Sequence, residues 1–410
     1  MDLLDKLMSA PLDFMKDYGG PFIVVLSLLV FIHEFGHYYV ARWFKVKVES
    51  FSIGFGPELF GRTDKNGTRW KFCLIPLGGY VQMYGDSDPA SARHSDQVAI
   101  SAAEEKAEDK AKIREMTPEE RKVTFFAKPV GQRAAIVFAG PAINYIFAIL
   151  VLTGLYMFQG QPYTPPIAAG IIDGSPAQKA GIHIDDKIIS VNGQEIRKFQ
   201  DLRKVTMLNL DKEMEVQVLR TAGKDKWKDK PVTLKVTPEL KIEEDRFGFK
   251  HSVGRMGISS PTSAFEMQKH DPISAVGAAF VEVWETSIDT LQALGQMIMG
   301  TRSTDELGGI LRIGAYAGEF AKQGLVAFIT FSALLSINLG LINLLPIPML
   351  DGGQLVMFAM EKVRGKPLPE RLQEYALRVG IAFLLGIMLF ATWNDLVQLK
   401  VVDYVVKLVS

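Results

Sequence analysis

The chain has 410 residues, of which 48% are hydrophobic and 22% are charged, and its 46 Lys and Arg residues balance 46 Asp and Glu residues. This composition excludes a disordered protein, which combines low hydrophobicity with excess charge, and it offers no basic surplus for binding nucleic acid. A single cysteine, Cys73, excludes an internal disulfide and any zinc site built from several cysteines.

Apolar residues are concentrated in four segments that meet or approach the roughly 20 residues needed to cross a bilayer. We predict membrane-spanning helices at about 20–40, 134–158, 325–345 and 375–393. Four Asp residues against two Lys residues precede the first segment, unlike the basic flank of a cleaved signal peptide, so we expect this helix to be retained. For the other three segments, the alternative is that they are buried helices of a large soluble enzyme.

Positive charges predict the orientation of the four spans. They follow the first span, precede the second, and lie between the third and the fourth. Loops rich in Lys and Arg stay in the cytoplasm. We therefore expect a multi-pass membrane protein with both termini and the segment 159–324 outside the cytoplasm.

Residues 48–83 predict a β-hairpin region between the first two spans. Residues 46–53 alternate between apolar and polar, and Asn66-Gly67 is a strong hairpin turn signal. An edge of such a sheet can accept an extended peptide, although a plain cytoplasmic hairpin is the alternative. The charged segment 86–121 has no aromatic residue, and we expect a solvated helix or a disordered stretch there.

Residues 163–240 predict a small extracytoplasmic module between the second and third spans. Its turn positions resemble those of a PDZ domain of the bacterial protease type: Gly174-Ser175-Pro176-Ala177, Ala180-Gly181, Asp186-Lys187-Ile188-Ile189 and Asn192-Gly193. A PDZ groove binds a peptide, often by its C-terminus, as an added strand. The alternative is a β-rich spacer without a ligand. Residues 272–300 have the spacing of an amphipathic helix, which could lie on the outer membrane surface, gate the site or simply pack.

The sharpest chemical signal is His33-Glu34-Phe35-Gly36-His37, in the last part of the first span. Residues four apart share one face of a helix, so both imidazoles can reach one zinc ion, with Glu34 beside them as general base. Zinc also needs a third protein ligand and an open position for water. Ionisable residues in an apolar span are costly and mark function, whereas an interfacial flank facing water is the alternative.

Asp351 is the best candidate for the third zinc ligand. It follows the third span, on the side of the membrane where His33 and His37 are expected. Two prolines between Asn343 and Asp351 break the helix at this point. The four other histidines fall in loops or in the outer module. We therefore predict that His33, His37 and Asp351 hold one zinc ion.

Together these motifs resemble the site-2 protease family of intramembrane zinc metalloproteases. Residues 138–144 in the second span and 76–80 in the hairpin region are also similar to that family. With a PDZ-like module between the second and third spans, the chain most resembles the bacterial RseP-type regulators of sigma-E proteolysis. The chain differs from that group in two respects. The best-studied type of the group has two tandem PDZ domains, whereas this sequence shows one, and the charged segment 86–121 looks like an insertion.

The resemblance implies a role for each candidate residue and a class of substrate. It implies zinc ligation by His33, His37 and Asp351, general base catalysis by Glu34, and substrate binding, oxyanion stabilisation or ordering of the site by Asn343 and Asn144. It also implies that the hairpin region pairs with an unwound substrate helix. The expected substrates are single-span membrane proteins after a first cleavage, such as an anti-sigma factor, or remnant signal peptides.

We therefore predict a polytopic α-helical membrane protein with four transmembrane helices, a membrane-associated β-hairpin region and one extracytoplasmic PDZ (α+β) domain. The expected segments are the first helix (1–45), hairpin region (46–85), charged cytoplasmic segment (86–128), second helix (129–160), PDZ domain (161–242), linker with an amphipathic helix (243–322), third helix (323–360), and fourth helix with a tail (361–410).

Two other classes of function remain as rivals. A non-enzymatic membrane adaptor would use the PDZ domain to gather partners, bind no zinc and tolerate Glu34→Gln. A metal transporter would pass an ion across the bilayer along a polar path. The second and fourth spans carry almost no ionisable residue, so the sequence offers no such path.

Overall fold

The structure is a computed structural model that describes residues 13, 15–85, 117–209, 212–220, 231–244, 249–260 and 266–399. The chain forms two compact units, each described by itself below. The helical unit comprises residues 10–151 and 313–390, and the β-rich unit comprises residues 1–9, 152–312 and 391–410. The boundary between the units falls within three helices, α7, α11 and α14, whose bounds follow.

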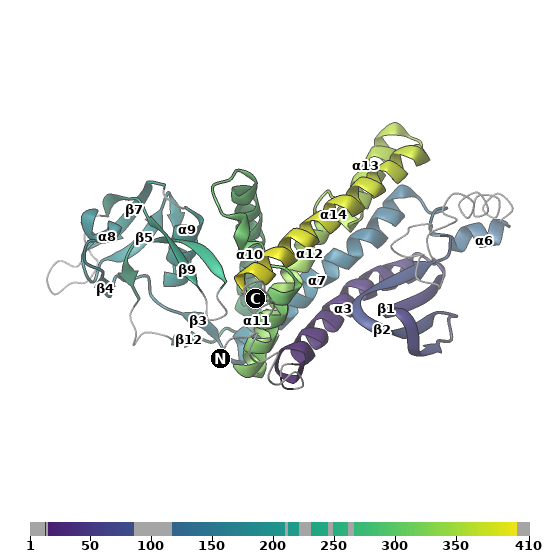
Figure 1. The fold of residues 1–410 in the computed structure, drawn as a ribbon, viewed down its shortest axis with the longest axis horizontal. Coiled ribbons are helices and arrows are strands. Elements are labelled where there is room, and N and C mark those ends of the chain that lie inside the picture. The colour runs from purple at the N-terminus through teal and green to yellow at the C-terminus, as the bar shows by residue number, and fades with distance from the viewer. Residues whose placement is uncertain are drawn as a thin grey trace, which may run out of the picture. The chain divides into compact units, whose positions relative to one another are not determined.

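The helical unit contains long apolar helices and a β-hairpin (Figure 1). In chain order its elements are the π-helical turn η1 (Met15–Gly19), α3 (Gly20–Trp43), β1 (Val48–Thr63), β2 (Arg69–Met83), α6 (Pro118–Val123), α7 (Val130–Phe158), α11 (Ile310–Lys322), α12 (Leu325–Leu344), α13 (Asp351–Arg364) and α14 (Glu370–Gln398). The predicted charged segment lies outside the described residues from position 86 to position 116.

Four helices of the described chain are long and apolar enough to cross a membrane, and they coincide with the four predicted spans. They are α3 together with η1, α7, α12, and α14 from Arg371 onward. The fourth begins earlier than predicted. Its first turns are charged, but the ion pair between Glu374 and Arg378, one helical turn apart, is compatible with a helix there.

The core of the helical unit is built on both halves of α3. Val25 and Leu29 of α3 pack with Ala317 of α11 and Phe331 of α12. Further along α3, Gly36 faces the backbone of α7, and a Cβ there would overlap with the carbonyl of Ala139. A small residue at this crossing lets the two helices approach closely. This close approach positions α7 beside the histidine-bearing turns of α3.

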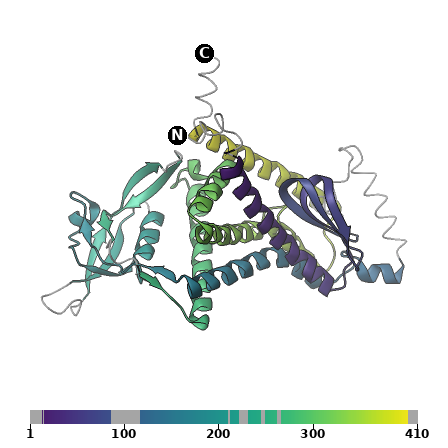
Figure 2. The ribbon, with the colours of Figure 1, turned by 90° about the horizontal axis from the view of Figure 1, so that it is seen from below.

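The hairpin strands β1 and β2 lie against α3 (Figure 2). The predicted turn is present: Gly67 has a φ of 84°, and the Asp64 carboxylate accepts from the backbone N–H groups of Asn66 and Thr68. Phe51 of β1 pairs with both Val81 and Trp70 of β2, which shows that the strands bend back on themselves. As a result, residues 79–83 form an outer edge of the sheet within the described part of the chain.

Among the described residues, the β-rich unit consists of short strands and three α-helices that lie wholly within it. Its elements are β3 (Gln161–Tyr163), β4 (Gly170–Ile171), α8 (Pro176–Lys179), β5 (Lys187–Val191), β6 (Gln194–Glu195), α9 (Phe199–Leu208), β7 (Met214–Leu219), β8 (Val232–Val236), β9 (Glu239–Glu244), β10 (Lys250–Arg255), β11 (Ile258–Ser259), β12 (Glu266–Gln268), α10 (Pro272–Ile298) and the 3-10 turn η2 (Thr304–Glu306). A four-stranded antiparallel sheet has the order β6-β5-β7-β8.

The module that the sequence places at 161–242 continues to Ser259 in the structure. Met256 is buried in the same apolar core as Ile188 of β5 and Leu202 of α9. Its carbonyl accepts from the N–H of Ala177, and β11 pairs with β4. The hairpin β9–β10 intervenes between the sheet and this last strand, which is why local turn signals did not indicate where the module ends.

Helix α10 has two different faces. Asp271 caps its N-terminus through the N–H groups of Ile273 and Ser274. One face packs on α9, where Glu282 pairs with Lys198 and Lys204. The other face carries large exposed apolar side chains at helical spacing: Ile273, Val276, Phe280, Trp284, Ile288 and Leu291. The predicted amphipathic helix is therefore present.

Candidate metal centre

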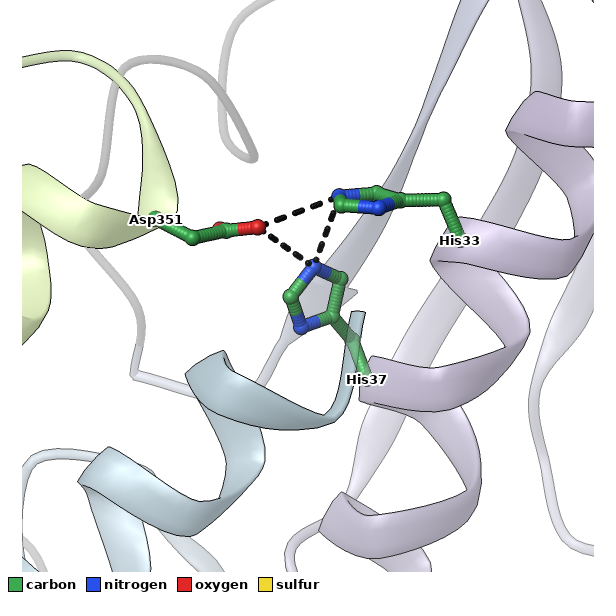
Figure 3. Close-up of side chains that lie close together, drawn as sticks. All are labelled: His33, His37 and Asp351. Carbon is green, nitrogen blue, oxygen red and sulfur yellow. Dashed lines mark hydrogen bonds and ion pairs between the residues drawn. The ribbon is translucent and has the colours of Figure 1, made fainter. Parts of the chain in front are cut away.

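His33 and His37 present two imidazole nitrogens to one point on the surface of α3. They are one helical turn apart and share a face, and both are at least 90% buried. Their Nε2 atoms are 3.3 Å apart, and their rings meet edge to face (Figure 3). Two nitrogens this close, both directed away from the helix axis, can ligate one metal ion.

Asp351 brings a carboxylate to the same point from a distant part of the chain. Helix α12 ends at Leu344, the segment with Pro346 and Pro348 reverses direction, and α13 begins at Asp351. A side chain at Gly352 or Gly353 would overlap with carbonyl groups of the preceding turn, so this reversal requires glycine at both positions. Asp351 Oδ2 then lies 3.1 Å from His33 Nε2 and 3.6 Å from His37 Nε2.

The three donor atoms have the spacing of a zinc site. Tetrahedral zinc with bonds of about 2.0–2.1 Å separates its ligand atoms by about 3.3 Å, and the three observed separations are 3.1, 3.3 and 3.6 Å. Two imidazoles and a carboxylate are also a donor set that zinc accepts, with one position left for water.

Helix α7 contacts the outer nitrogen of each imidazole. His37 Nδ1 lies 2.9 Å from the backbone carbonyl oxygen of Ile136, and His33 Nδ1 lies 3.1 Å from the side-chain amide of Asn144. Between these two contacts, Gly140 lies directly against both rings, where any side chain would overlap with them. Helix α7 therefore provides the surface against which both histidine rings pack.

A cavity of about 180 Å³ opens beside the three donors. Its lining includes Glu34, Asn343 at the end of α12, Gln354 of α13 and the β2 edge at Gly79, Tyr80, Val81 and Met83. Glu34 is half-buried, and Gly79 packs close to its side chain. The cavity thus combines a carboxylate, an amide and a strand edge with the predicted metal position.

The structure brings five of the six predicted site residues to this cavity. His33, Glu34, His37, Asn343 and Asp351 line it, whereas Asn144 is fully buried on the far side of His33. Sequence reasoning did not identify Gln354 or Gly140. Gln354 stands three residues after Asp351, a spacing that shares a helix face, and a glycine within an apolar span often marks close helix packing. Both signals were available.

The sequence is similar to those of known proteins over nearly its whole length. The sequence model of Peptidase family M50 matches residues 21–387. A protein of Agrobacterium fabrum that is named a zinc metalloprotease is 38% identical over 398 residues, which cover 97% of this chain and 100% of that protein. A similarly named protein of Rhizobium meliloti is 37% identical and covers 95% and 99% of the two chains. Metalloprotease MmpA of Caulobacter vibrioides is 37% identical and covers 93% and 96%.

Proposed function

The chain belongs to peptidase family M50, the site-2 protease family, and is a zinc metalloprotease in a membrane. We propose that it cleaves peptide bonds inside membrane-spanning helices. One observation carries the proposal. His33 and His37 of the cluster lie on α3, which is itself apolar and long enough to span a bilayer, and Asp351 joins them from the start of α13. A site built into such a helix is positioned for substrates that lie within the membrane.

In the proposed reaction each cavity residue has one role. A zinc ion held by His33, His37 and Asp351 would act as a Lewis acid and would lower the pKa of a bound water to about 7. Glu34 takes a proton from the attacking water on its carboxylate and delivers it to the leaving nitrogen. Asn343 donates a hydrogen bond from its side-chain amide to the oxygen that becomes negatively charged. The positions of Glu34 and Asn343 in the lining of one cavity support these assignments.

The edge of β2 is the proposed substrate-binding strand. A helical substrate hides its carbonyl groups in its own hydrogen bonds, so it has to unwind before cleavage. Residues 79–83 offer an outer strand edge in the wall of the cavity, and an unwound segment can pair there as an added strand. Exposed Leu59, Phe60 and Leu74 on the hairpin support its proposed association with lipid.

The proposed substrates are single-span membrane proteins that a first protease has already shortened, such as an anti-sigma factor, with remnant signal peptides as a second class. The β-rich module is proposed to be a PDZ domain that binds a peptide, often by its C-terminus. Its β4–β11 pair, helix α9 and four-stranded sheet support this assignment. Within the bacterial inner membrane, the charge pattern supports cytoplasmic loops near the site, with the module and both termini outside.

Purified full-length protein in detergent tests the proposal directly. Wild type, Glu34→Gln and Glu119→Gln are compared for bound zinc and for cleavage of a single-span helix with a trimmed outer domain. Glu119 is an exposed residue of α6 and serves as the matched control. We expect zinc in all three proteins, with cleavage by wild type and Glu119→Gln but not by Glu34→Gln.

Other outcomes contradict specific parts of the proposal. Cleavage by Glu34→Gln at the wild-type rate would remove its role as general base. Cleavage of unfolded soluble peptides but not of the membrane helix would contradict intramembrane proteolysis. Zinc-free wild type that cleaves nothing, and is unaffected by added zinc, would favour a membrane adaptor. Removal of zinc with a chelator should abolish cleavage, and zinc added back should restore it.

A further inference from the structure

The outer nitrogen of His37 shows how α7 prepares an imidazole for metal binding. His37 Nδ1 faces the carbonyl oxygen of Ile136 at 2.9 Å. A carbonyl oxygen can only accept a hydrogen bond, so Nδ1 carries the proton. The lone pair of the ring is then on Nε2, the atom that faces Asp351. A backbone group of α7 therefore selects the tautomer of His37 that can ligate a metal.

His33 needs an equivalent acceptor, and Asn144 is the residue in contact with its outer nitrogen. In the structure, Nδ2 of the Asn144 amide faces the ring and lies 3.1 Å from His33 Nδ1. Nδ2 can only donate, so this orientation would place the proton of His33 on Nε2, directed at the metal position. The buried Oδ1 of Asn144 meanwhile has no hydrogen-bond partner among the described residues.

Turning the Asn144 amide over resolves this mismatch for His33. The oxygen and nitrogen of an amide are told apart only by their hydrogen bonds. With Oδ1 toward the ring, Asn144 accepts from the Nδ1–H of His33, and Nε2 is free to bind the metal. His33 and His37 then have the same tautomer, each set by an acceptor on α7.

We propose that Asn144 is a positioning residue whose side-chain oxygen accepts a hydrogen bond from Nδ1–H of His33 and thereby directs Nε2 of His33 to the zinc ion. The inference rests on the zinc-binding role of His33 in the proposed function. It assigns Asn144 to the ligand and not to the substrate, because Asn144 has no exposed surface and does not belong to the described lining of the cavity.

A hydrogen bond between α7 and α12 helps to hold Asn144 in place for this role. The backbone carbonyl of Asn144 accepts it from Ser336 Oγ of α12 at 3.0 Å. Asn144 also lies one helical turn after Gly140, on the same face of α7. The glycine leaves room for the two rings, and the asparagine supplies the hydrogen bond one turn further along.

Two substitutions at position 144 separate the hydrogen bond from packing. Aspartate can accept but not donate, so Asn144→Asp should bind zinc within about threefold of wild type. Leucine has a similar size but cannot hydrogen-bond, so Asn144→Leu should lose about 10- to 100-fold in zinc affinity, the range for lost partners of metal ligands. The affinity is measured by chelator competition on full-length protein in detergent, with thermal unfolding in parallel. Thr330→Ala, which removes a hydroxyl that donates to the Val326 carbonyl within α12, is the control and should keep wild-type affinity.

A measurement on unaltered protein covers the case in which Asn144→Leu does not fold. In the zinc-bound wild type with 15N-labelled histidine, His33 should show a protonated Nδ1 and a ligated Nε2, assigned by comparison with His33→Gln. An unprotonated Nδ1, unchanged zinc affinity in Asn144→Leu, or a loss in Asn144→Asp equal to that in Asn144→Leu would each overturn the inference. Wild type that binds no zinc would instead remove the metal role on which both proposals rest, whereas zinc binding without cleavage of a membrane helix would contradict only the proposed function.

Discussion

Gly140 of α7 lies in direct contact with the imidazole of His37, so closely that a methyl group at position 140 would occupy the space of Nε2. The same methyl group would also crowd the ring of His33. The positions of both imidazole rings therefore depend on the absence of a side chain at position 140 of the neighbouring helix.

Gly140→Ala should abolish or strongly weaken zinc binding, because the added methyl group has to displace one or both rings. Forcing extra atoms into a packed site costs about 1–3 kcal/mol, and we expect at least a tenfold loss in zinc affinity by chelator competition. Gly154→Ala on the same helix is the control, since a Cβ there meets nothing within 4 Å. Equal zinc affinity in the two variants would contradict the packing seen here.

Glu361→Ala should destabilise the helical unit and weaken the metal centre, because Glu361 of α13 forms a buried ion pair with Arg133 of α7. The two groups are 2.6 Å apart, their side chains are 14% and 9% exposed, and the Arg133 guanidinium also lies over the ring of Phe358. Leaving a buried charge unpaired costs about 3–5 kcal/mol. Thermal unfolding and zinc release should both show the change.

An exposed ion pair provides the control for that experiment. Arg197 and Glu195 of the β-rich unit form a pair whose side chains are mostly exposed, and such pairs contribute at most about 1 kcal/mol. Glu195→Ala should therefore leave the unfolding temperature almost unchanged. If Glu361→Ala behaved in the same way, the connection between α7 and α13 would not depend on this ion pair.

Lys204→Met should loosen the packing of α10 on α9. The Lys204 ammonium faces three carboxylates of α10, those of Glu282, Glu285 and Asp289, at 3.5 to 3.7 Å. Without it these carboxylates repel one another, with Lys198 as the remaining counter-charge on Glu282. Since these groups are partly exposed, we expect a cost of roughly 1–2 kcal/mol, between the values for exposed and buried pairs.

Hydrogen exchange of the α10 backbone measures this loosening, and the expected cost corresponds to roughly 5- to 30-fold faster exchange. Lys235→Met removes a lysine from an exposed pair with Glu213 and should leave α10 unchanged. Protection of α10 in Lys204→Met equal to that in wild type would show that apolar contacts alone hold the two helices together.

Asp395→Ala should destabilise the β-rich unit, because Asp395 is fully buried and caps the start of α11 from another helix. Its carboxylate accepts from the backbone N–H groups of Gly309 and Arg312 and pairs with the Arg312 guanidinium. Removing it leaves a buried arginine without its carboxylate, at about 3–5 kcal/mol. Asp395→Asn keeps an acceptor for the N–H groups and should cost clearly less, as measured by thermal unfolding. Asp173→Ala, at an exposed position, is the control.

The sequence by itself determined the features that depend on short-range spacing. Helical periodicity places His33 and His37 on one face of α3, the length of the apolar runs identifies the four spans, and Asn66-Gly67 marks the turn between β1 and β2. The proline residues before Asp351 likewise predict a break in the helix, and the glycine residues after it permit tight turns, because both act on their own backbone. Each of these signals lies within a stretch of sequence no longer than about one membrane-spanning helix.

Only the tertiary structure decided the contacts that no motif or expected depth in the membrane indicates. Asp351 was predicted from the sequence to join the histidines, whereas the contact between Asn144 and His33, which are 111 positions apart, comes from the structure alone. The close fit of Gly140 under the two rings and the end of the β-rich module at Ser259 are decided in the same way. Such contacts depend on how helices cross and strands pair, which is set by packing over whole surfaces, and a local motif carries no information about the partner on the other side.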